Sequence, residues 1–141
     1  MDTDFSPYRR DYVARQQAME TAIGALRNRV RSAVANASPN LARLAALDAI
    51  MERVLGARER TLLSTLPALL AKHHARMQQL HQATPADAQA PDEPGRLLPE
   101  GGWQAVFLKD MQAVQLAELH LRLQPVEGLL AALRASEPMP T

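Results

Sequence analysis

The sequence contains no cysteine, and valine, isoleucine and threonine together supply only 15 of its 141 residues. The absence of cysteine excludes disulfide-stabilised scaffolds and thiolate metal sites. The shortage of β-branched residues argues against a β protein, because these residues suit a pleated, half-buried surface. Alanine and leucine instead supply 25 and 21 residues, a third of the chain. This composition predicts an all-α protein.

The chain also lacks a large excess of one charge and a long hydrophobic run. Its net charge is +1, which argues against a strongly basic nucleic-acid binder, although a balanced total can hide local patches. The acidic first residues have no signal-peptide core, and the uncharged run 61–71 is 11 residues long, against roughly 20 for a membrane span. We therefore expect one cytoplasmic domain, 1–141, without a transmembrane segment. Any contact with the inner membrane would be peripheral, through a partner.

Two serine-proline pairs predict the first two helix starts. Ser6 and Ser38 each precede a proline, the arrangement of an N-cap residue followed by the first helical position. From Tyr12 onward, seam residues alternate four and three apart for about 25 residues, which predicts a coiled-coil-like helix over about 7–36. The short connection at Ser38 predicts that a second helix, over about 39–82, runs antiparallel to the first.

Prolines divide the rest of the chain. Pro67 predicts that the second helix kinks or splits, with a kink expected near Thr65, because proline removes a backbone hydrogen bond and clashes one turn back. Residues 84–101 hold four prolines and are interpreted as a loop or linker. A third helix is expected over about 102–123, although 116–123 also alternates as a strand would. Pro125 predicts a bend or an end, then a short fourth helix over 125–135 and a flexible tail over 136–141. The predicted fold is an elongated antiparallel three-helix bundle with this short fourth helix.

Polar residues on or beside the apolar stripes are candidates for setting register or binding a partner. Gln16 lies in the first seam, and Asp48 and Arg58 lie along the second. A buried Asp48 would require a partner, for which the first helix offers several arginines. We favour the alternative, in which Asp48 and Arg58 lie at the edge of the stripe and the Arg58 stem covers leucines. Trp103 is expected to cap the core and is also a candidate partner anchor.

Arg27, Arg29 and Arg31 form a candidate phosphate-facing cluster on the first helix, with a solvated helix face as the alternative. No aromatic residues interleave with them. Glu118 and His120 are the best candidates for a general acid and base, but residues two apart on a helix point in different directions. The histidines near the end of the second helix lack the four-residue spacing of a helical metal site. The sequence therefore predicts no enzyme, no metal, no cofactor and no small-molecule substrate.

Several segments give the chain a family likeness. It resembles an uncharacterised proteobacterial family, domain of unknown function 3348, in the segments 5–9 (FSPYR), 15–20 (RQQAME), 44–52 (LAALDAIME), 109–114 (KDMQAV) and 121–130 (LRLQPVEGLL). The resemblance assigns no activity, so it carries over no catalytic residue. It implies that this chain lacks an N-terminal segment present in longer members. It also implies an accessory role in a cell-envelope complex, because family genes lie beside genes for envelope proteins with peptidoglycan-binding domains.

Two functions remain open from the sequence. The first is a bacterial, non-enzymatic helical interaction or scaffold protein that self-associates or binds a protein partner. The alternative is a nucleic-acid-associated protein that uses the arginine face of the first helix. The long seamed helices and the lack of catalytic groupings favour the first.

Overall fold

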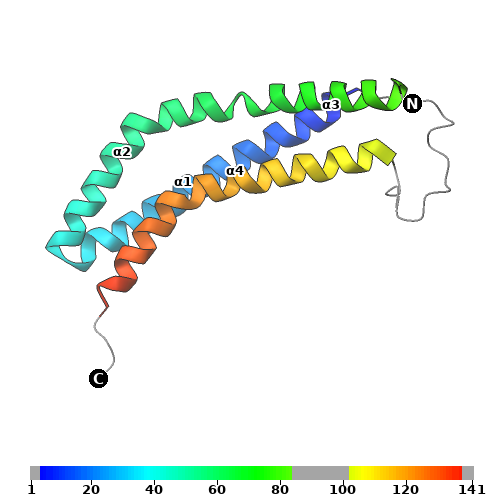
Figure 1. Cartoon of the computed structure of the whole chain (residues 1–141). Helices are drawn as coiled ribbons and strands as arrows, with labels where there is room; N and C mark the ends of the chain where they lie inside the picture. The colour runs from blue at the N-terminus through cyan, green and yellow to red at the C-terminus, as the bar shows by residue number, and fades with distance from the viewer. Residues whose placement is uncertain (1–3, 84–101, 138–141) are drawn as a thin grey trace.

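The computed structural model describes residues 4–83 and 102–137, and these residues form helices without a strand. The helices are α1 (Ser6–Ala37), α2 (Pro39–Leu63), α3 (Leu66–Ala83) and α4 (Gly102–Ala135). α2 and α3 follow one another along one long arc, and α1 and α4 run along its inner side in the opposite direction (Figure 1). The predicted all-α, antiparallel bundle is confirmed. The predicted linker at 84–101 and tail residues 138–141 lie outside the described residues.

The junction between α1 and α2 follows from one capping residue. The Ser38 hydroxyl accepts a hydrogen bond from the Leu41 amide at 3.1 Å, and Pro39 is the first helical residue, as predicted. The start of α1 differs, because Ser6 is already helical and its amide donates to the Asp4 carboxylate at 3.2 Å. One extended residue at Ser38 is therefore sufficient to reverse the chain.

The break between α2 and α3 is caused by Pro67. In a continuous helix the Leu63 carbonyl would accept from the amide of residue 67, and proline has none. α2 ends at Leu63 and α3 begins at Leu66, so Pro67 occupies the second position of a new helix, where an amide would lack a helical partner. The predicted single kinked helix is thus two helices that meet at the predicted place.

Pro125 does not end α4. The expected short fourth helix is instead the continuation of α4, which runs from Gly102 to Ala135 with Pro125 inside it. Val126 and Leu129 are buried directly after the proline. Their packing offsets the lost hydrogen bond, and α4 curves along its second half (Figure 1). The strand-like alternation at 116–123 is helical throughout, as we favoured.

The described core is divided into two apolar clusters. One, around Tyr12, Leu70, Phe107 and Met111, joins the start of α1 to α3 and α4. The other, around Val34, Ala45 and Leu129, lies near the α1–α2 junction. Buried polar residues on α1, α2 and α4 stand between the clusters in sequence: Gln16, Asp48 and Glu118. The bundle is therefore held together by apolar ends and specific polar contacts.

The predicted seam of α1 is followed at its start and departs from the inner side near the end. Tyr12 and Gln16 are buried, and Val30 still packs against the core, but then Val34 is buried, whereas Ala33 and Ala37, where the four-and-three spacing continues, are exposed. A straight α-helix drifts by about 20° per seven residues relative to a strict seven-residue repeat. Three such repeats bring Val34 to the inner side in place of Ala33.

Candidate interaction surface

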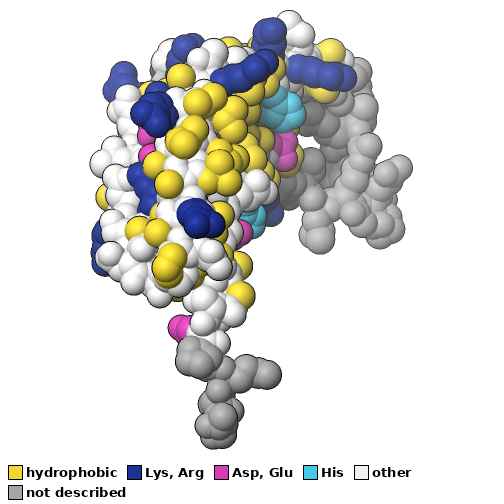
Figure 2. All heavy atoms as spheres, turned by 90° about the vertical axis from the view of Figure 1, so that its left-hand side faces the viewer, with side chains coloured by type: hydrophobic (Ala, Val, Ile, Leu, Met, Phe, Trp, Pro, Cys, Tyr) yellow, Lys and Arg dark blue, Asp and Glu magenta, His cyan; other side chains and the backbone are white. Residues whose placement is uncertain are grey.

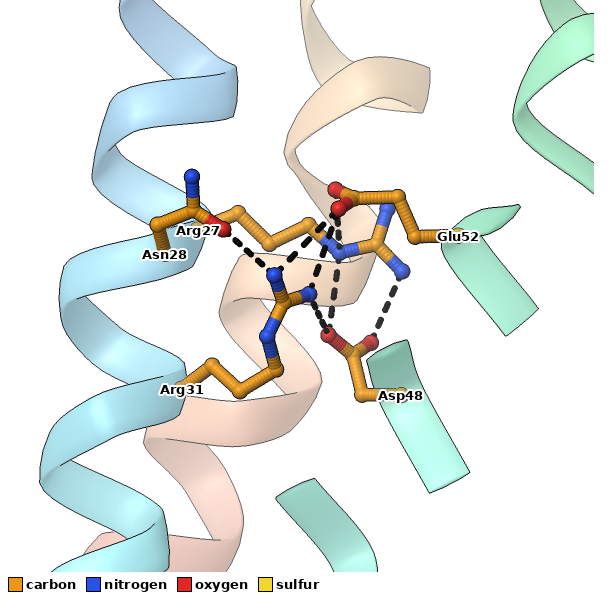
Figure 3. A network of polar contacts seen from close by, with 5 residues as sticks. All are labelled: Arg27, Asn28, Arg31, Asp48 and Glu52. Atoms are coloured by element: carbon orange, nitrogen blue, oxygen red, sulfur yellow. Dashed lines mark hydrogen bonds and ion pairs between the residues drawn. The ribbon is translucent and has the colours of Figure 1, made fainter. Parts of the chain in front are cut away.

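Two arginines of α1 bind two carboxylates of α2 (Figure 3). Arg27 donates two hydrogen bonds to the Asp48 carboxylate, from Nη2 to Oδ1 at 2.8 Å and from Nε to Oδ2 at 3.1 Å. Arg31 Nη1 donates to Asp48 Oδ2 at 3.0 Å and lies 3.3 Å from Glu52 Oε1. Asn28 orients Arg31 through its side-chain oxygen. Two positive and two negative charges thus compensate one another between the helices.

This network is largely enclosed, and its burial and charges determine the pKa of Asp48. The side chains of Asp48 and Arg27 are 10% and 14% exposed. Burial alone would raise the pKa of Asp48, but hydrogen bonds and charges from Arg27 and Arg31 outweigh it and hold that pKa below its usual value. The interpretation of Asp48 as a stripe-edge residue is wrong. Asp48 is instead buried and paired with arginines of α1, and the acidic side of α2 therefore faces α1.

A second polar cluster centres on Glu118, whose side chain is fully buried. Its carboxylate accepts hydrogen bonds from the Tyr12 hydroxyl at 2.8 Å, from Gln16 Nε2 at 2.9 Å and from Arg122 Nε at 2.8 Å. Burial and the adjacent carboxylate raise the pKa of Tyr12. Three donors thus converge on the Glu118 carboxylate, whereas His120 is exposed on another side of α4.

Gln16 links this cluster to the break in the outer arc. Its Nε2 also donates to the Leu63 carbonyl at 3.1 Å, the carbonyl that Pro67 leaves without a helical donor. The polar seam residue singled out in the sequence therefore has an internal role: it fixes the end of α2 against α1 and α4.

All five aromatic residues gather at the end of the bundle where α1 and α4 begin: Phe5, Tyr8, Tyr12, Trp103 and Phe107. His74 of α3 is buried among them, with ring centroids 4.9 Å from Phe107 and 5.1 Å from Trp103. Burial lowers the pKa of His74, and the charge of Asp4 opposes this in part. Trp103 is partly buried against this core cluster, as the capping interpretation expects.

The opposite side of α2 is apolar and about half exposed. Six large hydrophobic side chains there are between 47% and 66% exposed, and we call them the outer face of α2: Leu47, Ile50, Met51, Val54, Leu55 and Leu62. They recur three and four residues apart, so they share one side of the helix. Figure 2 looks at the molecule from the end where α1 and α2 join. It shows hydrophobic side chains gathered in a band, with Lys and Arg beside and within it.

The remaining predicted residues divide between the two sides. Arg58 is exposed and lies four residues from both Val54 and Leu62, so it belongs to the outer face. Arg29 is exposed on α1, whereas Arg27 and Arg31 bind carboxylates. The three arginines therefore do not form the phosphate-facing cluster that their spacing had offered.

A cavity of about 500 Å³ opens between α1 and α2, beside the arginine–carboxylate network. Its lining includes four arginines and three glutamates, with Gly24 and Gly56 leaving room between the helices. This mixed charge selects no ligand of one sign. Within 4–83 and 102–137, no group of three or more histidines or acids is placed to hold a metal ion.

The comparisons with known proteins give a family without an assigned activity. A family model described as "Protein of unknown function (DUF3348)" matches residues 1–135, so the chain belongs to that family. Neither a curated protein nor a solved structure matches it. In the part of the chain that is described, no helix is long and apolar enough to span a bilayer.

Proposed function

We propose that this member of the family is a non-enzymatic helical interaction protein that binds a protein partner through the outer face of α2. The observation that carries the proposal is the continuous exposure of six large apolar side chains along one side of a well-formed helix. Contiguous apolar patches on soluble proteins mark interaction sites more often than scattered exposed leucines do.

The energetics support this use of the face. Fully burying one leucine, valine or methionine side chain contributes about 1.5–3 kcal/mol. Six side chains that are about half exposed therefore hold several kcal/mol available to a partner, which is enough for specific association after its entropic cost. The outer halves of these side chains contact nothing in the described chain, so their burial remains available to a partner.

Nucleic-acid binding through the arginine face of α1 has less support from the geometry. Arg27 and Arg31 would have to exchange buried carboxylate partners for phosphate, which leaves Asp48 enclosed without a cation. The six apolar side chains of the outer face of α2 would also stay exposed beside a phosphate backbone, because they cannot bind it.

Affinity purification of the tagged chain from its native cells, with and without nuclease, tests the proposal. The wild type is compared with the double variant Leu47→Gln/Val54→Gln and with Leu121→Gln, a control on an exposed leucine of α4. We expect protein partners that survive nuclease, are lost from the double variant and remain with the control. Envelope proteins among them would support the accessory envelope role. Partners lost on nuclease treatment, or retained equally by all three proteins, would contradict the proposal.

A further inference from the structure

The exposed charges of the outer arc are all of one sign. Between residues 39 and 83 every Lys and Arg is exposed, and none of the three acids is: Arg43, Arg53, Arg58, Arg60, Lys72 and Arg76 against Asp48, Glu52 and Glu59. The pattern does not come from a lack of acidic residues in the sequence, because the acids are present and face inward. Arg53 and Arg60 line the cavity toward α1, where Arg60 pairs with Glu20. The cations at the apolar stripe itself are therefore Arg43 and Arg58, and no exposed acid accompanies them on the described arc.

The inward acids are held where they cannot serve the outer face. Asp48 and Glu52 bind Arg27 and Arg31, and Glu59 lines the cavity between α1 and α2. Arg58 stands within the apolar stripe, and Arg43 lies one turn before Leu47. Neither has an ion-pair partner in the described part of the chain. A partner that covers the stripe must therefore bring the missing negative charge.

We infer that the outer face of α2 binds an amphipathic helix of another protein, whose leucine-type seam is flanked by Asp and Glu. This inference rests on the proposed function and names the class of partner. Apolar side chains spaced three and four residues apart form the kind of surface against which a second amphipathic helix packs. Charges beside such a seam select the partner, because opposite charges pair and like charges repel.

The same observations disfavour the other occupants. A second copy of this chain would place one basic stripe against another without an exposed acid on either α2 or α3. A lipid surface is matched by interfacial aromatic residues, and all five aromatics lie at the other end of the bundle. Arg58 would also enter the apolar layer of a membrane, whereas beside a helix it can reach a carboxylate at the rim.

Site-specific photocrosslinking in native cells tests the inference and captures the partner in the same experiment. Val54 is replaced by the photoreactive residue p-benzoylphenylalanine in the full chain, and Leu121 is replaced in a matched control. The crosslinked segment is then identified by mass spectrometry. We expect an adduct at position 54, absent at 121, on a partner segment with helical apolar spacing and an excess of Asp and Glu.

A charge reversal gives the second arm. Arg58→Glu should reduce the yield of the position-54 adduct about tenfold. Arg29→Glu, the same charge change at an exposed position of α1, should leave that yield unchanged. An adduct on α2 of a second copy, or on a segment without excess acid, overturns the inference and leaves the proposed function standing. An adduct on phospholipid or nucleic acid, or no adduct above the control, overturns both.

Discussion

The middle of α2 reverses the usual pattern of a surface helix. Its inner side carries enclosed Asp48 and partly exposed Glu52, both bound by arginines of α1, between the buried Ala45 and Leu63. Its outer side carries leucine, isoleucine, methionine and valine, about half exposed and accompanied by arginine. A helix stabilised only within its own chain would gain more by turning the leucines inward.

The difference teaches that contacts within the bundle and contacts beyond it rest on separate residues of α2. An enclosed ion pair contributes specificity of register at a desolvation cost, whereas an exposed apolar stripe contributes affinity for whatever covers it. Substitutions on the inner side should therefore change stability. Substitutions on the outer side should change association.

The largest stability effect is expected at Glu118. Glu118→Ala removes the acceptor of three donors and leaves Arg122 enclosed without its carboxylate, which should lower the free energy of unfolding by roughly 3–5 kcal/mol. Urea unfolding followed by circular dichroism measures it. Glu127→Ala, an exposed acid of the same helix, should change stability by less than about 0.5 kcal/mol. Equal effects at both positions would contradict the buried cluster.

Adjacent residues of α2 give a sharper comparison. Asp48→Ala leaves Arg27 and Arg31 competing for Glu52 and should cost about 3 kcal/mol. Leu47→Gln, one residue earlier but on the outer face and 52% exposed, should lower the free energy of unfolding by about 1 kcal/mol or less. The same urea experiment compares them. A Leu47→Gln cost as large as that of Asp48→Ala would place Leu47 in the core and break the distinction.

The pH dependence of stability should show a smaller effect, which comes from the buried side chain of His74. Because burial lowers the pKa of His74 below 6.5, the unfolded chain takes up its proton first as the pH falls. This contribution to stability is complete above pH 6.5 and is lost as the pH falls through the folded pKa. Unfolding measured between pH 7.5 and 5 should show the decline, and His74→Gln should reduce it. An unchanged slope in that variant would assign the decline to other groups.

Local signals were sufficient for the helices and their junctions. Ser38 with Pro39 predicts the reversal, and Pro67 predicts the break in the outer arc, because each acts on backbone hydrogen bonds within one turn. Pro125 shows the limit: the local cost is the same, but packing of Val126 and Leu129 keeps the helix continuous. Local sequence cannot report how much apolar surface a later turn will bury.

The candidate surface was predicted only in part. The sequence indicated an apolar stripe on α2 with Asp48 and Arg58 along it, but not which side of the helix would face α1. Which side would meet α1 depends on whether Arg27 and Arg31 reach Asp48, a tertiary contact across 21 and 17 residues of sequence. The same holds for Glu118, which meets Tyr12 only after α4 folds back along α1.

The most direct test of the account is the native size of the tagged chain in cell extract, for the wild type and for Val54→Gln. We expect the wild type to sediment as a complex larger than its 15.5 kDa chain. Val54→Gln should sediment as a monomer with an unchanged unfolding midpoint. A wild type that sediments as a monomer, or a variant that keeps the size of the complex, would contradict the claim that the outer face of α2 is a binding surface.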